Sequence, residues 1–198
     1  SYDAFLENQD RLYQTFSTVG SLVLSLEDEE RVLDVIAEQL IRAARIRSLV
    51  LAIVYTDKHS LEVVRIASFN NLTEDGHLTA RSTPNVRRHI NWREDLADTE
   101  SMMCYSAREG SIVVVDGQND FIQSRTTHRP DQWEGKVSFF ERLQYNSECV
   151  AVLAGGCPLD EAETAVDWVQ DTMPLLELIS AQIKTLRCDF KVAVRCTV

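Results

Sequence analysis

The sequence predicts an α+β domain, an α/β sandwich whose central sheet of five to six strands is mostly antiparallel. Two observations indicate this class. The strand-like segments come in hairpin pairs, and amphipathic helical segments stand at both ends of the chain. A length of 198 residues with 44% hydrophobic and 26% charged residues is typical of one globular domain with a real core.

The first half of the chain contains two helical patterns followed by a hairpin. Apolar residues spaced by three, four and seven positions are typical of amphipathic helices, and continuous apolar runs of about eight residues are typical of buried strands. A polar stretch containing Gly76 and Pro84 then indicates a loop. We therefore expect helices over 2–26 and 27–45, strands over 48–55 and 61–69, a loop over 70–86, and a short helix ending before Gly110.

The second half contains three strand patterns and one long helix. Residues 118–135 show neither a helical nor a strand pattern, and a segment of that length suits a lid better than a connector. Gly155 and Gly156 are interpreted as a turn. We expect strands over 111–117, 137–143 and 148–154 and a helix that starts near Asp160 with a kink at Pro174. The tail over 188–198 could be a last strand or the beginning of a further segment, and the sequence does not decide between them.

Charge, hydropathy and cysteine content limit the kinds of partner and the cellular location that we expect for this domain. Twenty basic against 31 acidic residues give a net charge of −11, which disfavours a polyanion, so we expect no nucleic acid on this domain. No apolar run has the length of a membrane span, so we expect no membrane contact by this domain. Five cysteines without a CxxC pair indicate a reducing compartment, and we expect a cytoplasmic location. A start at Ser1 suggests a piece of a longer protein.

Three stretches carry a resemblance to a known family. The first is the helix over 33–45 followed by the hairpin 49–69. The second is 107–116, a small residue and a glycine followed by a strand that ends at Asp116. The third runs from 137 through 149–154 and a Pro-Leu-x-x-x-Glu helix start at 158–163 to Ala181-Gln182-Ile183. In order and spacing these stretches resemble the GAF domain of bacterial signalling proteins. The likeness divides the chain into a signalling helix (1–26), a GAF-like domain (27–187) and the tail (188–198).

The resemblance implies a pocket for a small molecule of unknown identity. The pocket would lie on the sheet face opposite the terminal helices and would be roofed by 84–108 and 118–136. No catalytic or metal-ligating set is expected, and the cofactor, if any, is unknown. The candidate ligand-binding residues are His89, Trp92, Tyr105, Asp116, His128, Trp133, Phe139 and Glu141.

Each of these candidates has a structural alternative. Trp92 and Trp133 suit the apolar wall of a pocket, but they could equally cover the sheet. Asp116 could accept a donor of the ligand or cap its own turn. Glu141 could point into the pocket or, by the alternation of a strand, toward solvent. His89 and His128 are the two histidines whose positions would suit a haem ligand. The alternative is that each is an isolated loop histidine exposed to solvent.

The resemblance also implies a homodimer formed by the terminal helices and a covalently linked output domain. The parent would be a histidine kinase, a cyclic-nucleotide enzyme or a transcription regulator, with this domain as its non-enzymatic sensory input. Packing of the same apolar stripes within one chain is the alternative. The candidate dimerisation residues are Phe5, Leu12, Phe16, Val19, Leu176, Ile179, Ile183 and Leu186.

Two other functions stay open. One is a ligand-free dimerisation module whose pocket is filled by its own side chains, with Trp92 and Trp133 packed flat on the sheet. The other is a thiol enzyme similar to free methionine sulfoxide reductase, in which Cys104 would be the reactive thiol. Cys104 is also the position for thioether attachment of a bilin, but the motifs that accompany such attachment are missing around it.

Overall fold

The computed structural model describes residues 29–44, 46–118, 135–163 and 176–185, together with the single positions 10, 14 and 167. The expected helix over 2–26, the segment 119–134, most of 164–175 and the tail lie outside the described residues. Predictions that depend on those segments, including the domain boundaries, stay predictions.

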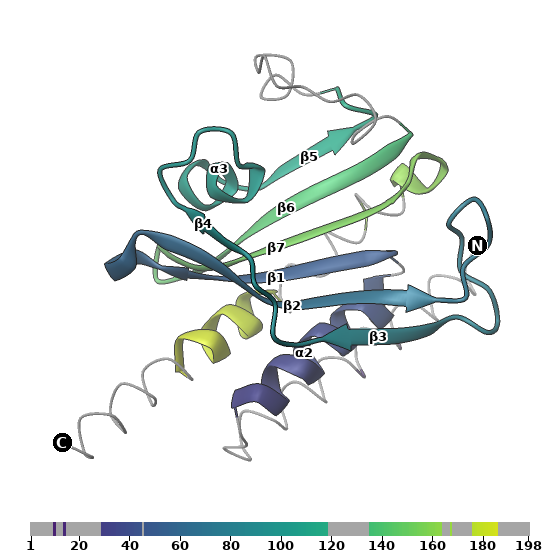
Figure 1. Cartoon of the computed structure of the whole chain (residues 1–198), viewed down its shortest axis with the longest axis horizontal. Coiled ribbons are helices and arrows are strands. Elements are labelled where there is room, and N and C mark those ends of the chain that lie inside the picture. Colours follow the sequence, from purple (N-terminus) through teal and green to yellow (C-terminus); the bar gives the residue numbers. More distant parts are fainter. Residues whose placement is uncertain are drawn as a thin grey trace.

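One antiparallel sheet forms the centre of the molecule (Figure 1). Six strands follow the order β3-β2-β1-β7-β6-β5, and a short seventh strand, β4, also pairs with β2. Every pairing is antiparallel, which confirms the predicted α+β class. The strands are β1 (Ser48–Tyr55), β2 (Ser60–Asn70), β3 (Thr83–Arg87), β4 (Arg93–Asp95), β5 (Ile112–Val115), β6 (Lys136–Tyr145) and β7 (Glu148–Pro158).

Helices from different parts of the chain cover the two faces of the sheet. Helix α2 (Glu29–Ala44) and the helical residues 176–185 lie on one face, and the short helix α3 (Met102–Glu109) lies on the other (Figure 1). Two acidic residues, Glu29 and Glu30, stand in the first turn of α2. Their negative charges interact favourably with the positive end of the helix dipole. Ser101 caps α3 by accepting a hydrogen bond from the amide of Cys104 at 3.1 Å.

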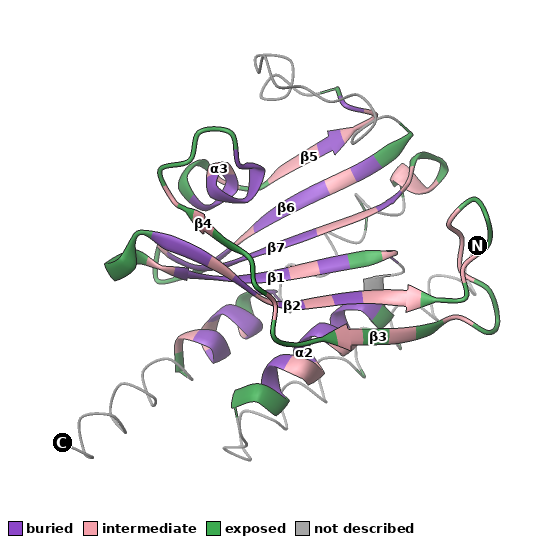
Figure 2. Cartoon of the chain, in the orientation of Figure 1, coloured by how far each residue is buried: buried purple, intermediate pink, exposed green. Residues whose placement is uncertain are grey.

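The larger part of the core lies between the sheet and the two helices of the first face. Figure 2 shows the burial concentrated in the central strands and on the sheet-facing side of α2. Residues 176–185 contribute Leu176, Ile179 and Ile183, which are 3%, 0% and 1% exposed. These three side chains are buried within the chain itself, as intramolecular packing predicts, and their part in a dimer stays a prediction. Phe5, Leu12, Phe16, Val19 and Leu186 lie outside the described residues.

An arginine network ties α2 to the edge of the sheet. The side chain of Arg65 on β2 is 3% exposed and donates to Asp34 at 2.7 Å and to the Glu30 carboxylate at 2.9 Å. Arg88, just after β3, donates to both carboxylate oxygens of Asp34, at 3.0 and 2.8 Å from its Nε. Burial of a guanidinium is costly unless its donors are satisfied, and here α2 supplies the acceptors. Arg65 therefore fixes the position of α2 against β2.

Three local predictions were wrong. The loop expected over 70–86 ends in β3, and β4 follows where part of a helix was expected. Both are short edge strands, of five and three residues, and β3 contains Pro84, which is typical of loops and of edge strands, so neither carries a strong strand signal. Gly155 and Gly156 lie within β7 instead of forming a turn. None of the helices in the described segments is long and apolar enough to cross a lipid bilayer.

Candidate functional site

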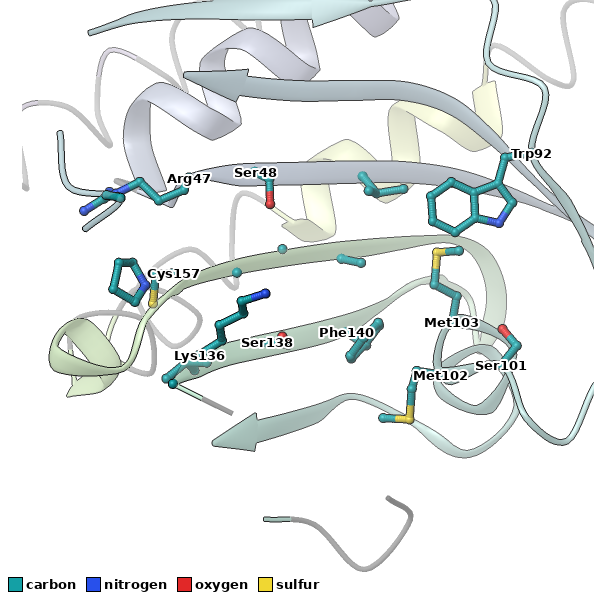
Figure 3. A pocket seen from close by; sticks show the side chains of 18 of the residues that line it. Arg47, Ser48, Trp92, Ser101, Met102, Met103, Lys136, Ser138, Phe140 and Cys157 are labelled. Carbon is teal, nitrogen blue, oxygen red and sulfur yellow. The ribbon is translucent and has the colours of Figure 1, made fainter. Parts of the chain in front are cut away.

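A cavity of about 730 Å³ opens on the sheet face opposite α2 and residues 176–185. Its floor is made by β1, β6 and β7. Its walls come from the loop after β2, from the segment that leads into β4, and from the start of α3 (Figure 3). The volume lies in the range of small-molecule sites, which are usually a few hundred to a thousand cubic ångströms.

The strand register orders the floor of the cavity into rows. Ser138 on β6 pairs with Gly156 on β7, which pairs in turn with Ser48 on β1. Two residues further along, Phe140, Ala154 and Val50 form the next row in the same way. Because side chains alternate along a strand, both rows face the cavity. Gly156 brings no side chain, so the floor between the two serine hydroxyls is open.

One end of the cavity is polar. Lys136 precedes Ser138 on the same side of β6 and extends over the floor (Figure 3). Arg47, beside Ser48, donates to the carbonyl oxygen of Gly76 at 2.5 Å and to both carboxylate oxygens of Glu161 at 2.5 Å. Arg47 thus joins the loop over the cavity to the 3-10 turn η2 (Leu159–Glu161), which follows β7. In the same region His77 lies 2.8 Å from Asp160.

The other end is mainly apolar. Phe140, Met103 and Trp92 gather there, and Met103 is almost fully buried. The indole Nε1 of Trp92 donates to Glu94 at 3.2 Å, and the same carboxylate accepts from the Ser101 hydroxyl. These contacts hold the Trp92 segment against the start of α3. Trp92 stays 40% exposed at the mouth of the cavity, so it forms a wall instead of lying flat on the sheet.

Among the predicted ligand-binding residues that the structure describes, Trp92 alone lines the cavity. His89 is exposed, with a φ of 55°, on the segment between β3 and β4, and Tyr105 packs with the core beneath α3. Asp116 accepts a hydrogen bond from the amide of Gly135 at 2.6 Å, so its carboxylate fixes the start of β6 as a turn residue. His128 and Trp133 lie outside the described residues.

Phe139 and Glu141 lie on the opposite face of the sheet from the cavity. The side chain of Phe139 is buried in the core with α2, and Glu141, two positions on, shares its face and is 3% exposed. The prediction placed both residues on one face, as the strand period requires, but it chose the wrong face. Burial raises the pKa of the Glu141 carboxyl, while a hydrogen bond from Ser111 acts in the opposite direction.

The cysteines of the described segments are unsuited to nucleophilic chemistry. Cys104, Cys149 and Cys157 are free and buried. Burial raises the pKa of Cys104 to about 11 and that of Cys157, at the cavity wall, to about 11. Reactive thiols have lowered pKa values and accessible, electropositive surroundings. The described residues also contain no group of three or more His, Cys, Asp or Glu side chains that could hold a metal ion.

Sequence reasoning missed most of the residues that make the cavity. Ser138 and Phe140 carried a signal, because they stand two positions apart in the predicted strand 137–143, and Lys136 directly precedes that strand. The face they share could not be chosen without the position of the helices. The loop residues Leu72 and Gly76 carried no signal, since the chain brings them over the floor only through the pairing of β2 with β1 and β3.

No protein-family model matches the chain, and no curated protein matches it in sequence. Solved structures match nearly its whole length. The GAF domain of Acinetobacter phosphoenolpyruvate-protein phosphotransferase is 12% identical, with a TM-score of 0.59 over 91% of this chain and 97% of that domain. An A. aeolicus GAF domain in an inactive state is 13% identical, with a TM-score of 0.58 over 90% of this chain and 98% of that one.

A third similar structure is an enzyme. Free methionine-R-sulfoxide reductase from Neisseria meningitidis, in complex with its substrate, is 14% identical, with a TM-score of 0.57 over 92% of this chain and 91% of the reductase. The fold of the chain is therefore that of GAF domains, as the resemblance in its sequence implied. At these identities the likeness concerns the fold, and it assigns neither a ligand nor an activity.

Proposed function

We propose that this chain is the small-molecule-sensing input domain of a larger bacterial signal-transduction protein, such as a histidine kinase, a cyclic-nucleotide enzyme or a transcription regulator. The cavity is the ligand site, the domain itself is not catalytic, and the terminal helices relay the ligand state within a homodimer to a linked output domain. The observation that carries the proposal is that the walls of the cavity are tied by ion pairs to α2 on the opposite face and to the turn η2.

Two arginines make these ties. Arg47 lines the cavity and holds the carboxylate of Glu161 in η2, the turn from which the chain continues toward residues 176–185. Arg88 lies four positions before Trp92 and holds Asp34 on α2. A ligand that moves the Trp92 segment therefore acts on an ion pair that ends on α2, and one that moves the Gly76 loop acts on an ion pair that ends in η2. A ligand shifts such an equilibrium only through unequal affinity for its two states.

A thermal-shift screen with a panel of small metabolites tests the proposal. A ligand that binds only the folded state adds about 2.7 kcal/mol of stability at a hundred times its Kd. For a domain of this size that corresponds to a rise in Tm of roughly 5–10 °C. We expect at least one metabolite to produce such a shift.

The control is Gly156→Val. Its side chain would project from the floor between Ser48 and Ser138, where the nearest heavy atom to an added Cβ is the carbonyl oxygen of Val137 at 3.2 Å. This variant should fold and should lose the ligand-induced shift. A shift of equal size in wild type and Gly156→Val would place the ligand elsewhere, and a panel without any shift would contradict the sensing function.

A further inference from the structure

The two ends of the cavity differ in a way that specifies the chemistry of its ligand. Along the cavity side of β6 stand an ammonium group, a hydroxyl and an aromatic ring, at Lys136, Ser138 and Phe140. At about 3.3 Å per residue, the first and last of these positions are roughly 13 Å apart. The floor therefore changes from cationic and polar to apolar over the length of a small amphipathic molecule.

Three polar side chains at the first end have no partner among the described residues. The Lys136 ammonium makes no hydrogen bond or ion pair with another described residue, and the Ser48 and Ser138 hydroxyls make none either, although the Lys136 carbonyl accepts from the amide of Asp116. Register places both hydroxyls beside Gly156, which leaves space between them. One ammonium and two hydroxyls around an open floor can donate three hydrogen bonds to one carboxylate, and such charge-assisted bonds are the strong ones.

The acidic residues of the cavity do not cancel this preference. Glu94 and Glu100 lie with Ser101 at the opposite end, and Glu94 already accepts from Trp92 and Ser101. Asp75 lies on the loop over the polar end; it and Lys136 are both exposed, so water screens both charges, and no ion pair joins the two side chains. Arg47 adds a second cation beside Ser48, with its charge shared with Glu161.

We propose that the ligand of this cavity is an organic monocarboxylate with an apolar body. Its carboxylate binds Lys136, Ser48 and Ser138, and its body lies along Phe140, Met103 and Trp92. This inference rests on the proposed sensing function and narrows it to one class of ligand.

Octanoate is the probe, measured by titration calorimetry and by thermal shift on the whole chain. Neutral octanamide has the same length and should bind at least tenfold more weakly, because it cannot make a charge-assisted pair with Lys136. In the series butanoate, hexanoate, octanoate, binding should tighten about fourfold per added methylene. A flat series would overturn the placement of the apolar body.

Two lysine variants complete the test. Lys136→Met keeps the length of the side chain and removes its charge, and it should bring octanoate down to the affinity of octanamide. Lys58→Met is the matched control, because Lys58 stands over the Tyr55 ring in the turn after β1 and does not line the cavity. It should leave both affinities unchanged. Equal loss in the two variants would overturn the assignment of the carboxylate to Lys136.

The metabolite panel separates this inference from the function on which it rests. If octanoate and octanamide bind equally, or if another class of compound binds in the cavity and octanoate does not, the carboxylate assignment is wrong while the sensing function stands. If no compound of any class stabilises the chain, both are wrong.

Discussion

Gly155 and Gly156 are neighbours on β7 that face opposite sides of the sheet, and this makes them a matched pair for testing which face holds the cavity. An added Cβ at Gly155 would lie 2.5 Å from Cζ of Phe139 and 3.0 Å from Cδ1 of Ile46, inside the packed core. An added Cβ at Gly156 would meet only the Val137 carbonyl oxygen at 3.2 Å and the Ser138 hydroxyl at 3.9 Å.

The expected magnitudes follow from these contacts. Overpacking of a core costs about 1–3 kcal/mol, and replacing glycine by alanine within a strand offsets about 0.5–1 kcal/mol of that. Gly155→Ala should therefore lower the free energy of unfolding by about 0.5–2 kcal/mol. Gly156→Ala meets one tight contact with the Val137 carbonyl oxygen, which a shift of a few tenths of an ångström relieves, and it has the same backbone gain, so it should lie within about 1 kcal/mol of wild type.

Urea unfolding followed by circular dichroism measures both variants. Adding Phe139→Leu to Gly155→Ala should relieve the clash, so the double variant should be more stable than the sum of the two single changes predicts, by at least about 0.5 kcal/mol. If Gly156→Ala proves the more damaging change, or if the effects of Gly155→Ala and Phe139→Leu simply add, the assignment of the two faces is wrong.

Three further predictions concern titratable groups. The hydrogen bond from Arg88, and then those from Arg65, lower the pKa of Asp34 against the opposing effect of burial. Asp34→Asn should therefore lose stability at neutral pH, and its deficit should shrink as the pH of the urea titration falls below about 4. Burial raises the pKa of Glu141. Glu141→Gln should therefore gain stability relative to wild type at pH 7, and the gain should vanish below about pH 4, where the carboxyl is protonated in both states. With a thiol pKa of about 11, Cys104 should resist iodoacetamide at pH 7.5 until the protein is unfolded, which peptide mapping by mass spectrometry can check. Rapid native labelling of Cys104 would contradict its burial.

The fold was largely predictable because its central strands carry strong local signals. The apolar run of β1 and the alternation of β2 give the first hairpin, and β6 and β7 give the second. The edge strands β3 and β4 were missed because they have only five and three residues and because Pro84 in β3 is typical of a loop. The end of β7 was missed because paired glycines are typical of turns, whereas here Gly155 leaves room for the Phe139 ring and Gly156 leaves the cavity floor open.

The candidate site was less predictable, since it depends on which face of the sheet the helices cover. Residues 139 and 140 are both phenylalanine, so the sequence alone cannot say which ring enters the cavity. The structure decides this through α2, whose apolar side chains pack with Phe139 and leave Phe140 to the opposite face. Lys136 and Ser138 then follow from Phe140 by the strand period.

The central claim is that filling the cavity affects the helices on the far side of the sheet. Hydrogen exchange of Ser138→Cys in a background with Cys157→Ser, Cys188→Ser and Cys196→Ser, before and after modification with butyl methanethiosulfonate, tests it without a known ligand; the remaining Cys104 and Cys149 are buried. The account predicts altered exchange in α2 and in residues 176–185 as well as at the cavity walls, whereas the same label on Lys58→Cys should change neither helix. Altered exchange confined to segments that line the cavity would contradict the claim.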